Sequence, residues 1–114
     1  TVRFPREAAD RRPGLLRRAS AWVTVIDSGK SVEFVPKGFS KATGIAYILE
    51  KLGINREDTA AFGDSMNDYE MLSFVGEGIA MGNSSEEILK LCARHTDSVY
   101  ENGIYNACVR NRWI

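Results

Sequence analysis

The stretch AFGDSMNDYEML, residues 61–72, decides the predicted fold, because a short apolar run there gives way to acids and then to a helical pattern. Gly63 ends the apolar run, and two carboxylates, Asp64 and Asp68, follow with the amide of Asn67 between them. The run lacks alternation, as in a strand buried on both faces of a parallel sheet. The stretch therefore predicts a strand-to-helix junction that carries two acids.

Apolar spacing predicts alternating helices and strands from residue 40 onward. Ser40 is the expected N-cap of the first helix, and Ser84 with Glu87 is an expected capping box for a later one. Such alternation is typical of a parallel sheet with crossover helices, so we expect an α/β fold, a partial doubly wound, Rossmann-like core. Helices are expected over 39–53, 67–75, 84–93 and 103–113, and strands over 59–64, 78–83 and, at a sheet edge, 97–100.

The chain before residue 40 has a different character. Two β-branched runs flank a turn-forming Asp-Ser-Gly-Lys at 27–30 and predict a β-hairpin, with Val32 and Phe34 on one buried face. A domain junction is expected at 36–40. The predicted strands cover 23–26 and 31–35, and the predicted domains cover 1–36 and 37–114.

The composition restricts the class of protein. The 114 residues carry no formal net charge, which argues against a nucleic-acid or membrane-surface role, and no apolar run approaches the length of a membrane span. Cys92 and Cys108 are expected as buried thiols of a reducing cytoplasm, with a disulfide as the alternative. His95 is the only histidine, so no zinc site is predicted, and a structural or exposed role is expected rather than catalysis. The arginine-rich first twenty residues are expected on a solvated face, because acids interrupt them as they do not in a targeting segment.

Polar side chains follow the two strands of the predicted parallel sheet. Ligands of open α/β sheets bind beyond the carboxyl ends of the strands, where Asp64 and Asn83 are expected. Asp68, about one helical turn after Asp64, can point to the same spot, and two hard oxygen donors suit Mg²⁺. A solvated helix start is the competing interpretation, since the helix dipole favours acids there. Ser65 is expected to hydrogen-bond locally.

Lys41 strengthens the interpretation as a metal site. It lies at a predicted helix N-terminus, where the dipole disfavours a cation unless that cation faces anions. A phosphate and the two carboxylates would be such anions. The alternatives are a surface lysine, or Lys37 in the same role.

Three segments, in this order and spacing, carry a resemblance to a known family: PKGFSKATGI at 36–45, GDSMNDYEML at 63–72 and GIAMGN at 78–83. They look like the C-terminal part of a haloacid dehalogenase (HAD) superfamily phosphatase, and most of all like the Cof-type hydrolases with a large α/β cap. The resemblance covers residues 22–114. It implies a Mg²⁺-dependent hydrolase of small phosphorylated metabolites, with 1–36 as the end of the cap and 37–114 as the C-terminal half of the core.

The resemblance also implies roles for single residues. Lys41 resembles the lysine that steadies the nucleophile and the phosphoryl group. Asp64 resembles the direct Mg²⁺ ligand, and Asp68 resembles the second acid, which holds the metal directly or through water. Asn67 matches the amide of the family motif, and Asn83 matches a loop position near the substrate phosphate.

The family's nucleophile is absent from the sequence. The family reaction needs an aspartate in an Asp-x-Asp-Gly-Thr motif, which forms an aspartyl-phosphate that water then cleaves. No Asp-x-Asp occurs in the 114 residues. Asp27 follows an apolar strand, but Gly29 stands where the second acid would be, so a turn is its expected role. We expect that the isolated chain does not hydrolyse phosphate esters.

The missing segment has a structural consequence as well. In the family the nucleophile strand pairs beside the strand that residues 59–62 would form. Without it, this strand has an unpaired apolar edge, which should recruit the missing N-terminal part as a separate chain, a second copy of the chain, or a rearranged N-terminal segment. Two alternatives stay open: a non-catalytic α/β remnant or interaction module that retains the metal loop, and a response-regulator-like receiver domain, which fits the GDSMND layout less well.

Overall fold

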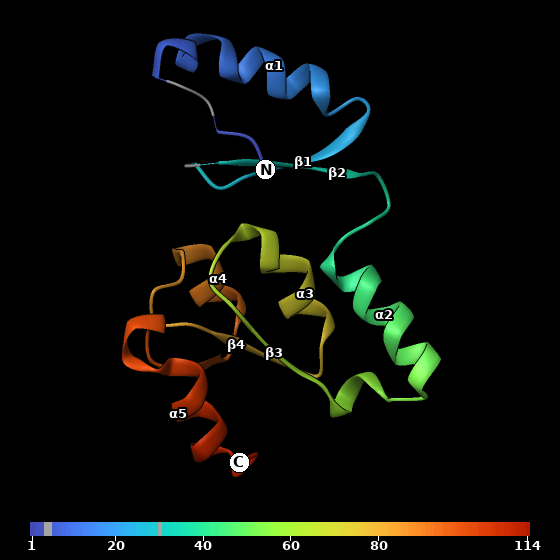
Figure 1. The fold of residues 1–114 in the computed structure, drawn as a ribbon, viewed down its shortest axis with the longest axis vertical. Helices are drawn as coiled ribbons and strands as arrows, with labels where there is room; N and C mark the ends of the chain where they lie inside the picture. Colours follow the sequence, from blue (N-terminus) through green and yellow to red (C-terminus); the bar gives the residue numbers. More distant parts are fainter. Residues whose placement is uncertain (4–5, 30) are drawn as a thin grey trace. The chain divides into compact units, whose positions relative to one another are not determined.

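The computed structural model describes residues 1–3, 6–29 and 31–114. The chain divides into two compact units, Thr1–Ser40 and Lys41–Ile114 (Figure 1). The assignment of these units to a cap end and a core half of a parent enzyme stays a prediction.

The first unit joins a short helix to a β-hairpin. Strands β1 and β2 pair antiparallel with Val25 opposite Phe34, so the predicted hairpin is confirmed. Val32 is fully buried and bridges to Val2, but Phe34 remains 38% exposed. The predicted buried face is thus only partly formed, because a two-stranded ribbon can bury little surface. The elements are η1 (Arg6–Arg11), α1 (Arg12–Ala19), β1 (Val23–Asp27) and β2 (Val32–Pro36) (Figure 1).

Asp27 has a structural role at the end of β1. Its carboxylate forms an ion pair with the guanidinium of Arg12 and accepts a hydrogen bond of 2.8 Å from the N–H of Gly29. This agrees with the expectation of a turn residue. Lys30 of the predicted turn, and the side chain of Arg6 among the predicted solvated arginines, lie outside the described residues.

The second unit is a three-stranded parallel sheet with helices, which confirms the predicted fold class. The strand order is β3-β4-β5, and within the described chain β3 pairs with β4 alone. The helices α3 and α4 form the crossovers between successive strands. The bounds are α2 (Lys41–Leu52), η2 (Arg56–Asp58), β3 (Ala60–Gly63), η3 (Met66–Asp68), α3 (Tyr69–Phe74), β4 (Glu77–Ala80), α4 (Glu86–Leu91), β5 (Arg94–His95), η4 (Val99–Glu101) and α5 (Gly103–Arg110).

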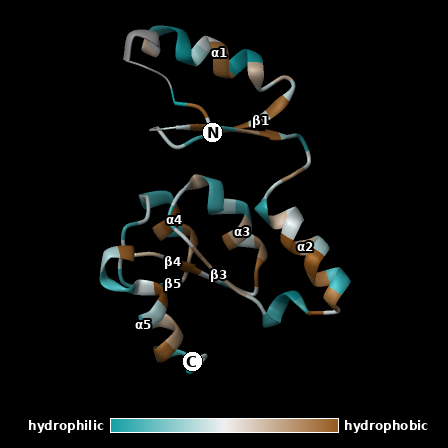
Figure 2. Ribbon diagram, in the orientation of Figure 1, coloured by the Kyte–Doolittle hydropathy of each residue, from teal (hydrophilic) through white to brown (hydrophobic). Residues whose placement is uncertain are grey.

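The core of the second unit lies where the sheet meets α3 and α4. Ile45 of α2 packs against the edge of this core. On the opposite face of β3, the ring of Phe62 meets Trp113 edge-on, with 6.4 Å between the ring centroids. Figure 2 shows apolar residues gathered on these strands and on the inner sides of the helices. The buried cluster contains Ala61, Leu72, Val75, Ala80, Ile88 and Cys92.

Two predictions about local structure are wrong. The predicted edge strand at 97–100 does not form: the second half of the segment belongs to the 3-10 helix η4, Val99–Glu101, whose capping box joins Ser98 to Glu101. The capping box predicted for Ser84 does not form, because α4 begins only at Glu86 and the Ser84 hydroxyl donates instead to the carbonyl of Gly63, at 3.1 Å. Both segments carry the Ser-x-x-Glu pattern, and only the tertiary contacts decide which of them caps a helix.

A polar network holds the segment after β5 against α5. The Thr96 hydroxyl donates to the carbonyl of Gly103 at 2.7 Å, and the Asn106 amide donates to Oδ2 of Asp97 at 2.9 Å. The hydrogen bond from Asn106 is the main cause that lowers the pKa of Asp97, and the charge of Arg110 lowers it further.

The cysteines and the histidine have structural surroundings. Cys92 and Cys108 are free thiols, the first buried and the second half-buried, so the prediction of buried thiols is confirmed for Cys92 alone. Nε2 of His95 lies 2.9 Å from the carbonyl oxygens of Leu89 and Cys92, which agrees with a structural role. Among the described residues, no helix is long and apolar enough to cross a membrane.

Candidate metal and phosphate site

The candidate site lies at the carboxyl ends of β3 and β4. The two strands are parallel, with Gly63 opposite Ala80, so the loops that follow them leave the same edge of the sheet. The loop after β3 carries Asp64 and Asp68, and the loop after β4 carries Asn83. The topology therefore brings together residues about twenty positions apart.

Lys41 and Asp68 form the central ion pair of the site. Lys41 is the first residue of α2, and its Nζ lies 2.5 Å from Oδ1 of Asp68. The Asp68 side chain is 10% exposed and the Lys41 side chain is 48% exposed, so the ammonium group reaches from the surface to a buried carboxylate. The anion explains why a lysine is tolerated at a helix N-terminus.

Asp68 also connects the ion pair to Asp64. Its second oxygen, Oδ2, accepts a hydrogen bond of 3.0 Å from the backbone N–H of Asp64. A carboxylate with both oxygens engaged is fixed in orientation, and the backbone of Asp64 is fixed with it. The structure thus brings Lys41, Asp68 and the Asp64 backbone into one chain of contacts.

Position 63 requires glycine because the side chains of Asp68 and Leu72 leave no room there for a Cβ atom. A Cβ at this position would lie 2.7 Å from Cβ of Asp68 and 2.8 Å from Cδ1 of Leu72. Asp68 can turn back toward the end of β3 only because the residue there has no side chain.

The loop after β4 clamps the Asp64 segment. Nδ2 of Asn83 donates to Oδ2 of Asp64 at 3.0 Å, and the N–H of Ser85 donates to the Asp64 carbonyl at 2.9 Å. The Ser84 hydroxyl binds the preceding carbonyl, that of Gly63. Asp64 itself is exposed, and within the described chain its Oδ1 accepts no hydrogen bond. Sequence reasoning missed both serine contacts, for which the capping pattern was a misleading signal.

Asn67 lies beside the acids. Its Oδ1 accepts a hydrogen bond of 2.6 Å from the hydroxyl of Ser65, which therefore bonds locally as expected. Lys37, the alternative to Lys41, belongs to the first unit.

The residues present fit part of a Mg²⁺ site. Asp64 presents an exposed carboxylate oxygen, the kind of hard donor that Mg²⁺ prefers, and Mg²⁺ commonly keeps several waters beside one or two carboxylates. Asp68 is already engaged by Lys41 and the backbone, which suits an indirect role. Within residues 1–3, 6–29 and 31–114 no group of three or more acidic, cysteine or histidine side chains is placed to hold a metal.

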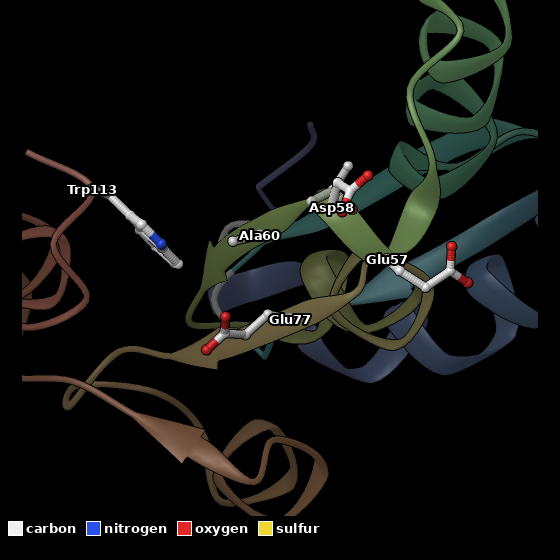
Figure 3. A pocket seen from close by; sticks show the side chains of 6 residues that line it. Glu57, Asp58, Ala60, Glu77 and Trp113 are labelled. Atoms are coloured by element: carbon white, nitrogen blue, oxygen red, sulfur yellow. The ribbon is translucent and has the colours of Figure 1, made fainter.

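A hollow of about 410 Å³ lies at the opposite end of the strands. Its lining includes Ala60 and Glu77, which pair at the amino ends of β3 and β4. Figure 3 shows the indole of Trp113 directed toward Ala60 across this hollow. Because ligands of such sheets bind at the carboxyl ends, this hollow is not the candidate site.

Comparison with known proteins identifies the family. A model of the haloacid dehalogenase-like hydrolase family matches residues 13–108. The chain is 51% identical over 76 residues to the "Uncharacterized protein in pdhA 5'region" of Geobacillus stearothermophilus, across 67% of this chain and 80% of that protein. It is 43% identical over 75 residues to kanosamine-6-phosphate phosphatase of Bacillus subtilis (strain 168), across 66% of this chain and 27% of the phosphatase.

A solved structure shows the same fold. A HAD subclass IIB sugar phosphatase superposes with a TM-score of 0.81 at 26% sequence identity, across 92% of this chain and 41% of the sugar phosphatase. The chain belongs to the haloacid dehalogenase-like hydrolase family, and it spans less than half of the length of these two phosphatases. The predicted family is confirmed, and the receiver-domain alternative is set aside.

Proposed function

We propose that the chain supplies the charge-neutralising half of a Mg²⁺-dependent phosphatase that acts on small phosphorylated metabolites. The chain of contacts from Lys41 through Asp68 to Asp64 carries this proposal. It brings an ammonium group and an exposed carboxylate to the carboxyl edge of the sheet. The relatives named as a kanosamine-6-phosphate phosphatase and a sugar phosphatase favour a sugar phosphate as substrate.

Each residue has a proposed role in phosphoryl transfer. A carboxylate from outside the 114 residues attacks phosphorus and displaces the alcohol, which takes a proton from a second acid that also lies outside them. Water then gives a proton back to that acid, attacks the aspartyl-phosphate and releases inorganic phosphate and the free carboxylate. Lys41 neutralises the nucleophile and the phosphoryl oxygens, and Asp68 orients Lys41. Mg²⁺, when bound, would add positive charge beside the phosphoryl group, with Asp64 as direct ligand and Asp68 as direct or water-mediated ligand. Asn67 is a candidate contact to the phosphate.

A chimeric enzyme tests the proposal. Residues 41–114 would replace the matching part of kanosamine-6-phosphate phosphatase, which provides the missing nucleophile, and release of phosphate would be measured. We expect activity in the chimera and a loss of at least about 10²-fold on Lys41→Met or Asp64→Asn. A folded chimera without activity, or with activity indifferent to both substitutions, contradicts the proposal. Glu50→Gln, on the exposed surface of α2, serves as the matched control.

The isolated chain is proposed to be inactive. We expect no turnover of an aryl phosphate with Mg²⁺, because no Asp-x-Asp pair occurs in the sequence to provide a nucleophile and an acid. Turnover that disappears on Asp64→Ala would show this to be wrong. We place the chain in the cytoplasm, where its free thiols would stay reduced.

The free edge of β3 is proposed as a partner site. Within the described chain β3 pairs on one side only, so its other backbone groups can accept a further strand. The expected occupant is a strand that bears the nucleophile, and a second copy of this chain is the other outcome of the test. Light scattering after size-exclusion chromatography decides, since a stable monomer at high concentration counts against a second copy.

A non-catalytic interaction module is the second candidate function. The observation in its favour is the absence of an Asp-x-Asp pair from the sequence. Calorimetric titration with Mg²⁺ separates the two, because a retained metal site should lose its heat of binding on Asp64→Asn, whereas an inert remnant should show no such heat.

A further inference from the structure

We propose that Asn83 is a positioning residue that orients the Asp64 carboxylate toward the metal and ties it to helix η4. The family resemblance assigns Asn83 to the substrate phosphate, and the geometry points to a different use of its amide. The inference rests on the proposed function, because the oriented carboxylate matters there as a metal ligand.

Both ends of the Asn83 amide are engaged. Nδ2 donates to Oδ2 of Asp64 at 3.0 Å, and Oδ1 accepts from the backbone N–H of Val99 at 2.8 Å. A backbone N–H can only donate, so the amide oxygen must face Val99 and the NH₂ group must face Asp64. The chemistry of the two partners thus determines the orientation of the amide without reference to the phosphate.

Asn83 controls the carboxylate itself, whereas the neighbouring contacts hold the backbone. Asp68 and Ser85 bind the N–H and the carbonyl of Asp64, and neither bond restricts rotation of its side chain. Among the described residues, Asn83 alone donates to the carboxylate. By occupying Oδ2 it leaves Oδ1 for a metal and removes one orientation that a solvent-exposed aspartate would otherwise sample.

Val99 provides a fixed anchor for the amide. It begins η4, which the Ser98–Glu101 capping box stabilises, and Asn106 donates to the carbonyl of Glu101 at 2.9 Å. The hydrogen bonds therefore run from Asp64 through Asn83 to the backbone at the start of η4.

Hydrogen exchange tests this bridge without any metal. The exchange rate of the Val99 amide would be measured by NMR in the wild type, Asn83→Ala, Asp64→Ala and the double variant. We expect about fivefold faster exchange or more in Asn83→Ala, a smaller increase in Asp64→Ala, and no further increase when the two are combined. Unchanged exchange in Asn83→Ala, with the fold intact by circular dichroism, overturns the inference, and so do fully additive effects of the two variants.

Metal affinity tests the positioning role. Binding of Mn²⁺ alone, as a paramagnetic substitute for Mg²⁺, would be followed by relaxation of nearby backbone amides. We expect about tenfold weaker binding in Asn83→Ala, the lower range for loss of a hydrogen bond to a metal ligand. Asn106→Ala is the matched control, because it loosens η4 while leaving the Asn83 bond to Asp64 in place, and its Mn²⁺ affinity should equal that of the wild type.

The outcomes separate the two proposals. If the wild type binds Mn²⁺ and Asp64→Asn abolishes binding, an unchanged affinity in Asn83→Ala overturns the positioning role. If Asp64→Asn leaves Mn²⁺ binding unchanged, the proposed function loses its metal site. The hydrogen-exchange experiment then decides by itself whether Asn83 links Asp64 to Val99. An equal loss of affinity in Asn106→Ala would mean that Asn83 acts through general loosening of η4, which also overturns the inference.

Discussion

The substitution Gly63→Ala should destabilise the second unit and disturb the candidate site at once. The new Cβ would lie 2.7 Å from Cβ of Asp68, 2.8 Å from Cδ1 of Leu72 and 3.0 Å from Cγ of Asp68. Carbon atoms in contact prefer about 3.5–4.0 Å, so Asp68 or the backbone must move by roughly 0.8 Å. Asp68 is buried and holds both Lys41 and the Asp64 N–H, and this movement therefore strains two polar contacts as well as the packing.

The magnitude follows from these contacts. Overpacking of a tight site costs about 1–3 kcal/mol, and weakening of the Asp68 hydrogen bonds adds about 1 kcal/mol. The expected loss in the free energy of unfolding is therefore about 2–4 kcal/mol. Gly44→Ala is the matched control: a Cβ there meets no atom within 4 Å, and alanine in the interior of α2 should stabilise by about 0.5–1 kcal/mol.

Urea denaturation at 25 °C measures both variants. Trp113 reports on the second unit because its ring contacts Phe62, and a Trp22→Phe background removes the signal of the first unit. The two substitutions should shift the midpoint in opposite directions. A Gly63→Ala variant within about 0.5 kcal/mol of the parent would refute the argument, since a site that accepts a methyl group at no cost is not closely packed.

Three further predictions concern single contacts. Lys41→Met should lower the free energy of unfolding by about 1–2 kcal/mol, because it leaves the buried Asp68 carboxylate without its ammonium partner. In an Asp68→Asn background this carboxylate is absent, so Lys41→Met should cost less there. Equal losses in both backgrounds would argue against the ion pair. The pKa of Asp97 is lowered in the folded state, so its ionised carboxylate stabilises the fold fully above about pH 4, and this contribution is lost as the pH falls through the folded-state pKa. The melting temperature should therefore change less between pH 6 and pH 2 in Asp97→Asn than in the wild type. Identical plots of melting temperature against pH for the two proteins would contradict this. Burial raises the pKa of Cys92, so a thiol reagent followed by mass spectrometry should modify half-buried Cys108 first, and faster labelling of Cys92 would show that its burial is misjudged.

The sequence carried enough local information to predict the helices of the second unit and two of its three parallel strands, whereas β5 at Arg94–His95 was not predicted. The helical stripe after Ser40 predicts a helix that the structure has at Lys41–Leu52, and short apolar runs without alternation predict the strands that begin at Ala60 and Glu77. These patterns reflect burial of one helix face or of both sheet faces, which neighbouring residues determine. Placement of Asp64 and Asn83 at the ends of parallel strands follows from the same reasoning.

Local patterns failed where distant segments compete for the same polar groups. Ser84 has the sequence of a helix cap, yet its hydroxyl binds the carbonyl of Gly63, and the capping box forms at Ser98. The requirement for glycine at Gly63 is one of space beside Asp68, which no spacing rule reveals.

The amino-acid sequence by itself determined the α/β alternation, the family resemblance and the presence of Lys41, Asp64 and Asp68 at element ends, because all of these are encoded in residue type and spacing. Only the tertiary structure decided that Lys41 meets Asp68, that Asp68 binds the backbone of Asp64, and that the amide of Asn83 faces a carboxylate. Two of these contacts, Lys41 with Asp68 and Asn83 with Asp64, join residues that are far apart in the chain, and the third depends on how the loop after β3 folds back on itself. Their geometry depends on strand register and helix packing, which are properties of the folded unit as a whole.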